Sequence, residues 1–536
     1  MSESKTQATL PVAIQRAELL ILAQQTQAFD VLVIGGGATG LGVAVDAAQR
    51  GLSVLLVEAQ DFAKGTSSRA TKLLHGGVRY LAQGDIALVR EALHERTVIM
   101  RNAPHLASAM PFLTPVYGFA GRWFYKWFYG IGLVLYDFLA GKAGLGKTEI
   151  LSAAKVIDRM PGVRTDKLAG AVQYWDGQFD DARLAVALAR TAADQGACVL
   201  NHCRASELLH VDGKVVGAKI VDMERDNAFA VHAGCVINAT GVWVDEVRRM
   251  DRSSARDIIV PSQGVHLVVD REFLPGGYGL LVPRTRDKRV LFAVPWLGKV
   301  ILGTTDTPRL EIEAEPQALA EEVQFILDEA ANYLSRAPTR VDVRSVWVGL
   351  RPLVKPSDED DNDSKGISRE HTVLVSASSL VTVTGGKWTT YRAMAEDVLE
   401  RCWQAGLIPS VRQPSSHTLR LMGAPEVQER PVSDPPGLHS YGLDALVLRE
   451  LPGHQRELVD GLTEAMVRFA ARYEFARTVE DVLARRSRLL FLDAGAAIRV
   501  ANDVAEILRD ELGPDFDADH SAQAFRDIAI NYLVAA

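Results

Sequence analysis

The sequence predicts an α/β protein that combines a discontinuous dinucleotide-binding domain, a substrate sheet and a C-terminal all-helical domain. Three observations support this fold class: strand, glycine-rich turn, helix and strand follow one another between residues 29 and 58, an α/β pattern returns after residue 181, and helical periodicity dominates after residue 400. With 536 residues, of which 48% are hydrophobic, the chain can build several cores.

The charge balance and the cysteine content argue against nucleic-acid-binding proteins and against disulfide-stabilised secreted proteins. Lys and Arg number 59 against 67 Asp and Glu, a formal net charge of -8, so we expect no nucleic-acid partner. The four cysteines form no CxxC pair and are too few to staple a chain of this size. The N-terminus also lacks a signal-peptide pattern, and together these features predict a reducing, intracellular location.

The first strand–helix–strand unit carries a glycine pattern typical of Rossmann-like folds. In GGGATG, Gly35 permits the tight turn, Gly37 lets the backbone approach a pyrophosphate, and Gly40 lets the helix pack on the strand. Glu58 ends the second strand, where its carboxylate accepts hydrogen bonds from ribose hydroxyls and disfavours a 2′-phosphate. The motif by itself does not separate NAD from FAD.

Two later segments favour FAD. Thr66, Ser67 and Ser68 supply hydroxyls soon after the second strand. Gly241 closes a later strand in NATG, on the same nucleotide face. Ordinary turns use the same residue types, so each segment taken singly is weak support.

Shifts in pattern divide the chain into seven segments. The FAD-binding domain is predicted to be discontinuous, because its α/β pattern returns twice. The predicted segments are an N-terminal extension with an amphipathic helix at 1–28, the FAD-binding domain at 29–100, 181–260 and 371–400, the cap and substrate-binding regions at 101–180 and 261–370, and the C-terminal helical domain at 401–536.

Over nearly the whole chain from Asp30 onward, the sequence resembles the FAD-dependent glycerol-3-phosphate dehydrogenases, particularly their mitochondrial-type branch. The segments that carry the resemblance are GTSSRATKLLHGGVRYL, PSQGVHLVVD, ILGTTDTP, WVGLRPLV, SREHTV, GGKWTTYRAMAED and TVEDVLARRSRLLFL. The resemblance implies a fold of the glutathione-reductase and D-amino-acid-oxidase type. It also implies oxidation of sn-glycerol 3-phosphate to dihydroxyacetone phosphate by hydride transfer to FAD N5, with electrons passed to a quinone.

The resemblance also implies which residues form the site. A phosphate ester needs several converging cations, and the planar fork of Arg matches phosphate oxygens. The implied substrate-binding residues are Arg79, Thr304, Thr305, Arg351, Arg369 and Lys387. The implied cofactor-binding residues, besides those named above, are His75, Gly76, Gly77, Gly386 and Lys387.

Oxidation of a secondary alcohol requires a base that reaches its hydroxyl proton. His266 is the first choice, with Arg351 and Arg79 as further catalytic residues. A histidine in an alternating strand is also commonly structural, and His75 and Arg351 are alternatives for proton handling.

A quinone acceptor implies peripheral association with the cytoplasmic membrane. The aromatic segment at 122–136 is one candidate for membrane contact, although packing inside the cap explains it equally well. Oxygen as the acceptor, a carboxylate substrate, a non-catalytic flavoprotein scaffold and a homodimer remain open. No metal site is predicted, because the acidic segment at 357–365 lacks the glycine of a calcium loop.

Overall fold

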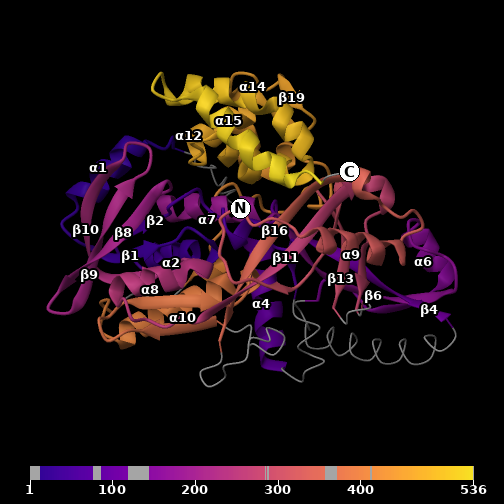
Figure 1. The fold of residues 1–536 in the computed structure, drawn as a ribbon, viewed down its shortest axis with the longest axis horizontal. Coiled ribbons are helices and arrows are strands. Elements are labelled where there is room, and N and C mark those ends of the chain that lie inside the picture. Colours follow the sequence, from indigo (N-terminus) through magenta and orange to yellow (C-terminus); the bar gives the residue numbers. More distant parts are fainter. Residues whose placement is uncertain are drawn as a thin grey trace, which may run out of the picture.

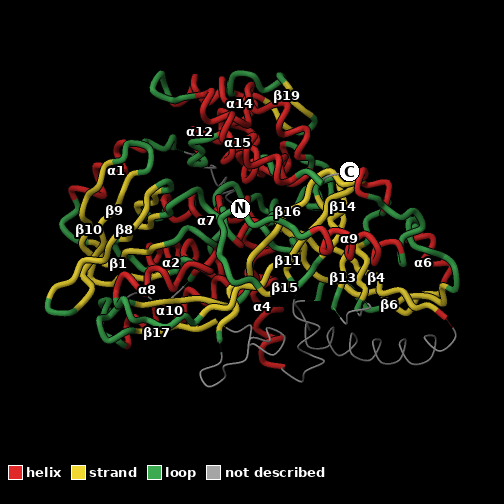
Figure 2. Tube along the Cα trace, viewed as in Figure 1, coloured by secondary structure: helices red, strands yellow, loops and turns green. Residues whose placement is uncertain are grey.

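The computed structural model divides the chain between two large sheets and a C-terminal helical domain that lies above their junction in the view of Figure 1. Figure 2 shows strands concentrated in the two sheets and helices in the upper domain. The structure describes residues 12–75, 86–118, 144–283, 285, 289–355, 371–410, 413 and 415–534.

The first sheet has eight strands in the order β17-β18-β10-β1-β2-β7, with β8 and β9 attached through β10. Strands β1, β2, β7 and β10 run parallel, as expected of a Rossmann-like sheet. The strands are β1 (Phe29–Ile34), β2 (Val54–Val57), β7 (Cys198–Leu200), β8 (Cys203–Val211), β9 (Lys214–Asp222), β10 (Asn227–Asn238), β17 (His371–Val375) and β18 (Val381–Gly385).

Both faces of this sheet are covered, which explains the continuous apolar runs in its central strands. In β1, Val31 and Val33 face one core, whereas Leu32 and Ile34 face the other. The helices around the sheet are α1 (Arg16–Gln25), α2 (Ala38–Gln49), α4 (Ile86–Asn102), α7 (Asp181–Asp194), α8 (Val244–Asp251) and α10 (Tyr391–Gln404). Helices α2, α7 and α10 pack together on one face, and α1 packs on the other.

The second sheet has ten strands in the order β15-β11-β14-β13-β12-β4-β6-β3, with β16 paired to β11 and β5 to β6. Its strands are β3 (Leu73–Leu74), β4 (Ala107–Tyr117), β5 (Glu149–Ser152), β6 (Leu168–Phe179), β11 (Ile259–Asp270), β12 (Gly279–Val282), β13 (Leu291–Trp296), β14 (Lys299–Gly303), β15 (Thr307–Pro308) and β16 (Val343–Val354). Helices α6 (Ala153–Arg159) and α9 (Ala320–Ala331) contribute to the core on one of its faces. Strand β3, which follows the loop at residues 65–68, pairs with β6 and so brings that part of the chain into this sheet.

The C-terminal domain is mainly helical and also contains a short hairpin. Its elements are α11 (Ala445–Glu450), β19 (Glu457–Val459), β20 (Leu462–Thr463), α12 (Glu464–Tyr473), a π-helical turn (Asp481–Arg486), α13 (Leu489–Leu492), α14 (Ala494–Leu512) and α15 (Ala518–Ala529). Asp493 and Asp517 cap the two longest helices by accepting backbone N–H groups. No described helix is long and apolar enough to cross a membrane.

Buried ion pairs join this domain to the first sheet and its helices. Arg183 of α7 pairs with Glu474 at 2.7 Å, and Asp61 accepts hydrogen bonds from both Arg485 and Arg486. His202 Nε2 donates to the carboxylate of Asp481 at 3.0 Å, close to the same pairs. Because buried charges are tolerated only when they are paired, these contacts fix the domain in one position.

Two segments are interrupted in the structure. Residues 197–211 form two strands, β7 and β8, because His202 between them adopts a left-handed φ of 50° and its N–H donates to Gln60 O at 2.7 Å. After Lys387, a 3-10 turn, Trp388–Thr390, precedes α10.

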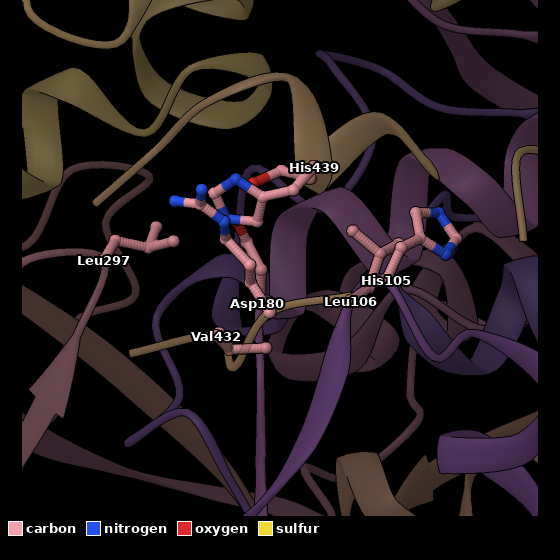
Figure 3. A pocket seen from close by; sticks show the side chains of 8 residues that line it. His105, Leu106, Asp180, Leu297, Val432 and His439 are labelled. Carbon is pink, nitrogen blue, oxygen red and sulfur yellow. The ribbon is translucent and has the colours of Figure 1, made fainter. Parts of the chain in front are cut away.

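A cavity of about 10 Å³, enough for roughly one water, lies where the sheets and the C-terminal region meet (Figure 3). It is lined by His105, Leu106, Asp180, Leu297, Arg430, Val432, His439 and Ser440. None of these was predicted as a site residue.

Candidate functional site

The glycine-rich turn between β1 and α2 is shaped by close backbone contacts. Gly35 has φ +114°, and a Cβ there would lie 2.6 Å from Ala239 O. Gly37 is the residue before α2 and has no side chain to block the helix N-terminus. A Cβ on Gly40 would overlap Gly35 O, so this glycine permits the helix to pack on the turn.

Glu58 is held against the same turn. Its carboxylate accepts hydrogen bonds from Gly36 N at 2.7 Å and from Gln60 N at 2.9 Å. Burial raises the pKa of Glu58, and these two N–H groups oppose that effect. Each oxygen keeps a further lone pair, which suits the ribose-binding role expected of this position.

The loop at 65–68, called the cofactor loop here after its predicted role, lies directly over the start of α2. Ser67 Oγ accepts a hydrogen bond from Ala38 N at 3.0 Å, and Ser67 O accepts one from Trp388 Nε1 at 2.8 Å. Ser67 therefore joins the start of α2 to the turn that precedes α10. This contact also places the 386–387 segment beside the cofactor loop.

Two further glycines lie beside the glycine-rich turn, Glu58 and the cofactor loop, and together these segments form what we call the cradle. Gly241 has φ +62°, and its carbonyl accepts a hydrogen bond from Thr384 Oγ1 at 3.3 Å. Gly386 has φ +72°, and a Cβ there would lie 2.5 Å from Met394 Sδ. Because the turn before α2 consists of glycines, no Cβ blocks the approach of a dinucleotide to the helix N-terminus, and the described residues fit FAD.

The cofactor loop docks on strand β16 of the second sheet. Thr66 Oγ1 donates to Leu350 O at 2.5 Å, and Arg69 NH1 donates to Val348 O at 3.2 Å. A Cβ on Gly349 would lie 2.8 Å from Arg69 O, so this glycine lets the loop and the strand approach. The contacts join the cofactor region to the predicted substrate region.

His266 lies on β11 of the second sheet, paired with Gly303 of β14 on one side and with Trp347 of β16 on the other. Its ring stacks on Trp347 with centroids 4.1 Å apart, and its Nε2 shares a hydrogen bond with Thr71 Oγ1 at 3.0 Å. A Cβ on Gly303 would lie 2.6 Å from His266 Cδ2, so glycine leaves room for the imidazole. Thr71 belongs to the segment that follows the cofactor loop.

The imidazole is held in its neutral form. Burial, followed by the positive charges of Lys72 and Arg351, holds the pKa of His266 well below its ordinary value of 6.5. Its Nδ1 is buried without a hydrogen-bond partner in the part of the chain that the structure describes. A neutral imidazole can accept a proton, as a general base must.

Arg351 lies across β11 on the same face as His266. Its guanidinium covers Gly264, which precedes His266 by two residues and therefore points to the same side of the strand. It donates to Thr304 Oγ1 at 3.3 Å and pairs with Asp306 at 3.2 Å. The structure thus brings together three of the predicted residues from three separate strand regions.

Thr304 and Thr305 differ in their surroundings. Thr304 faces Arg351, whereas Thr305 Oγ1 donates to Glu322 on α9 at 2.8 Å and accepts from Val265 N at 3.0 Å. Because Thr305 is also 1% exposed, its hydroxyl holds the sheet to α9 in this structure. Its predicted contact with substrate stays a prediction.

Several predicted residues lie outside the described residues or at their edge. Gly76, Gly77, Arg79, Arg369 and the aromatic segment at 122–136 lie outside them, as does the acidic segment at 357–365. His75 is half-buried at the end of β3, and Lys387 precedes the Trp388 turn beside the cofactor loop.

Sequence reasoning missed Thr71, Lys72 and Trp347. Lys72 is fully buried, and its Nζ lies 4.4 Å from the centroid of the Trp347 ring. Lys72 and Thr71 stand inside the segment that carried the family resemblance, yet nothing in local periodicity shows that a lysine there is buried. The pairing of Trp347 with His266 depends on strand register, which one sequence does not reveal.

Comparison with known proteins identifies the family of the chain. Residues 30–401 match the family model described as FAD dependent oxidoreductase, and residues 438–518 match the C-terminal domain of alpha-glycerophosphate oxidase. The mitochondrial glycerol-3-phosphate dehydrogenase of Arabidopsis thaliana is 39% identical, over 94% of this chain and 86% of its own length. The human mitochondrial enzyme is also 39% identical, over 97% of this chain and 75% of its own length.

A solved structure is similar over nearly its whole length. Glycerol-3-phosphate dehydrogenase from Bacillus halodurans, complexed with FAD, aligns with a TM-score of 0.78 and 26% identity, over 97% of this chain and 98% of that chain. The fold class predicted from the sequence is confirmed by this match and by the family model. The chain belongs to the glycerol-3-phosphate dehydrogenase family of FAD dependent oxidoreductases.

Proposed function

We propose that this enzyme oxidises sn-glycerol 3-phosphate to dihydroxyacetone phosphate with FAD as the hydride acceptor. One observation carries the proposal: the cluster of His266, Arg351 and Thr304 lies on a sheet to which the cofactor loop is directly hydrogen-bonded. FAD supplies a ring that accepts hydride at N5. The relatives that share the fold over most of the chain carry the name of this activity.

The phosphate requires cations, and Arg351 is the described candidate with the clearest geometry. Asp306 and Thr304 hold two sides of its guanidinium, so the fork is oriented before a substrate arrives. We assign Arg351, with Lys387, Arg79 and Arg369, to substrate binding. Four cations suit a phosphate ester better than a carboxylate, which one Arg commonly satisfies.

His266 is assigned as the proton acceptor for the C2 hydroxyl. Its neutral state allows it to accept a proton, and Nε2 is the nitrogen on the side of Thr71 and the cofactor segment. The resulting imidazolium lies near two cations, so it must return the proton before another turnover. Thr71 orients the ring by its hydrogen bond to Nε2.

A quinone at the cytoplasmic membrane is proposed as the electron acceptor. Support comes from the family resemblance and from the aromatic composition of residues 122–136, which is typical of segments at a membrane interface. Reoxidation of the reduced protein by a soluble quinone analogue, compared with reoxidation by oxygen, tests this part separately. Faster reoxidation by oxygen would replace the dehydrogenase assignment with an oxidase.

The substrate assignment is tested by mixing the purified yellow protein anaerobically with sn-glycerol 3-phosphate while following flavin absorbance. Glycerol and a 2-hydroxy acid serve as controls. Bleaching by the phosphate ester alone is the expected result. Bleaching by the 2-hydroxy acid alone would assign a carboxylate substrate, and no bleaching would refute the proposed activity.

A further inference from the structure

Two buried cations meet beneath the cofactor loop. Lys72 and Arg488 are 0% and 1% exposed, although they come from opposite ends of the chain. Both donate to the carbonyl of Ser68, Lys72 Nζ at 2.7 Å and Arg488 NH2 at 2.9 Å. Ser68 is the last residue of the 3-10 turn that forms the cofactor loop.

Two carboxylates balance these cations. Asp181 accepts from Lys72 at 2.7 Å and from Arg488 at 3.1 Å, and Asp180 lies 3.3 Å from Arg488. The cluster therefore contains two basic and two acidic groups, all of them buried. Burial lowers the pKa of Lys72 to about 7, so the guanidinium of Arg488 is the constant positive charge of the cluster. Loss of either cation leaves an uncompensated negative charge close to the loop, which is costly in a low-dielectric interior.

The backbone of the C-terminal domain holds Arg488 in an unusual conformation. It lies between the π-helical turn and α13 with φ +64°, in the left-handed region that residues other than glycine rarely adopt. Its NH1 donates to Ala484 O at 2.7 Å, and its guanidinium lies 4.3 Å from the centroid of the Phe491 ring. The guanidinium therefore bridges its own domain, at Ala484 and Phe491, and the carbonyl of Ser68.

We propose that Arg488 is a positioning residue for the flavin, acting from the C-terminal domain through the carbonyl of Ser68. The proposal rests on the FAD-binding role assigned above to residues 65–68. Ser67, the neighbour of Ser68, contacts both the start of α2 and Trp388, so a shift of this turn moves two sides of the cradle. The C-terminal domain thereby contributes both geometry and charge to a cofactor bound by another domain.

The consequence for the flavin has two measurable parts. Release of Ser68 loosens the cradle and weakens FAD binding. Loss of one positive charge makes the surroundings more negative, which disfavours the electron-rich reduced flavin and lowers its midpoint potential. A purely structural role would weaken the fold without lowering the potential of the flavin that remains bound.

The test compares Arg488→Met with Arg477→Gln in the full-length holoenzyme. Arg477 also joins the two domains, through Glu224 at 2.7 Å, but it is partly exposed and does not contact the loop. We expect Arg488→Met to raise the FAD dissociation constant at least about tenfold, as for loss of a buried charge-assisted hydrogen bond, and to lower the midpoint potential. Arg477→Gln should leave both quantities at their wild-type values.

Arg488→Lys keeps the charge but loses the planar fork, and it provides a second variant where Arg488→Met does not fold. We expect its potential to lie closer to wild type than that of Arg488→Met, with FAD binding still weakened. Wild-type FAD dissociation in either folded variant would overturn the proposal, as would equal effects of Arg477→Gln. Neither readout requires substrate, so failure of the glycerol 3-phosphate assignment would be seen separately.

Discussion

The cofactor cradle and the substrate cluster are built in different ways. The cradle depends on short-range features: one glycine-rich turn, one acidic residue at a strand end and one hydroxyl-rich loop, all within residues 35–68. The substrate cluster depends on register between strands that are far apart in sequence, as His266 stacks on Trp347 and Arg351 crosses Gly264. A single sequence therefore reveals the geometry of local turns far better than it reveals which distant residues come together in the fold.

The cradle and the substrate cluster are joined by few hydrogen bonds, so their contributions to function can be measured separately. The loop bonds to β16 through Thr66, and Thr71 reaches His266 a few residues later. Changes in the cradle should therefore alter FAD binding, whereas changes in the cluster should alter reduction of bound FAD. The predictions below test this separation.

Substitution of His266 should produce the largest effect. His266→Gln removes the proton acceptor, so we expect flavin reduction by substrate to slow roughly 10²–10⁴-fold, the usual contribution of general acid–base catalysis. Anaerobic stopped-flow absorbance measures the rate. FAD content and dissociation should match wild type, and substantial FAD loss would show that the two regions are not separable.

Substitution of Arg351 should affect substrate binding more than the cradle. Arg351→Lys keeps the charge but loses the fork that Asp306 and Thr304 orient, so we expect a roughly tenfold or larger rise in KM. Steady-state kinetics with an artificial acceptor separate KM from kcat. A change in kcat alone would instead assign Arg351 to proton handling.

A substitution in the cradle should show the opposite pattern. A Cβ on Gly37 would lie 3.1 Å from Ser67 Oγ and would occupy the space through which the pyrophosphate approaches the backbone. We expect Gly37→Ala to weaken FAD binding by roughly tenfold while the reduction rate of the remaining holoenzyme is retained. Flavin fluorescence on dilution measures the release, and unchanged release would contradict the cradle assignment.

The smallest expected effect is a shift in pH dependence. Because the pKa of His266 is held well below 6.5, flavin reduction should persist at pH values where an ordinary histidine is protonated. Lys72→Met removes one of the cations responsible, so the acidic limb of the reduction rate should move to higher pH. An unmoved limb would assign that limb to another group.

The same pKa has a consequence for stability. The unfolded chain binds a proton at His266 below about pH 6.5, whereas the folded state keeps the ring neutral. The unfolded state therefore binds more protons there, and the contribution of His266 to the free energy of unfolding falls as the pH drops below 6.5. Denaturant titrations of wild type and His266→Gln at several pH values isolate this contribution.

The fold class and the close-packed glycine-rich turn could be predicted from the sequence, for physical reasons visible in particular residues, whereas the assignment of individual cradle residues to FAD stays a prediction. Gly35 and Gly40 are required where a Cβ would meet backbone, and buried parallel strands leave continuous apolar runs. Prediction of the cluster depended on family resemblance, because no spacing in the chain shows that residues 266, 304 and 351 meet. Strand pairing does show it.

The burial of charged side chains could not be predicted from the sequence. Lys72 and Arg488 look like ordinary surface residues in a list of residue types, and only tertiary packing places them on one carbonyl. The same limit applied to the C-terminal region, whose helical pattern contains no evident catalytic motif. Arginines that are paired in the interior leave no periodic signal.

The central claim, that substrate is oxidised at the contact between cradle and cluster, is tested most directly by single-turnover reduction with sn-glycerol 3-phosphate deuterated at C2. We predict slower anaerobic bleaching of the wild-type flavin with the deuterated substrate than with the protiated one, because the C2–H bond breaks as hydride leaves. No bleaching, or the same rate with both substrates when reduction rather than binding limits the signal, would contradict the account.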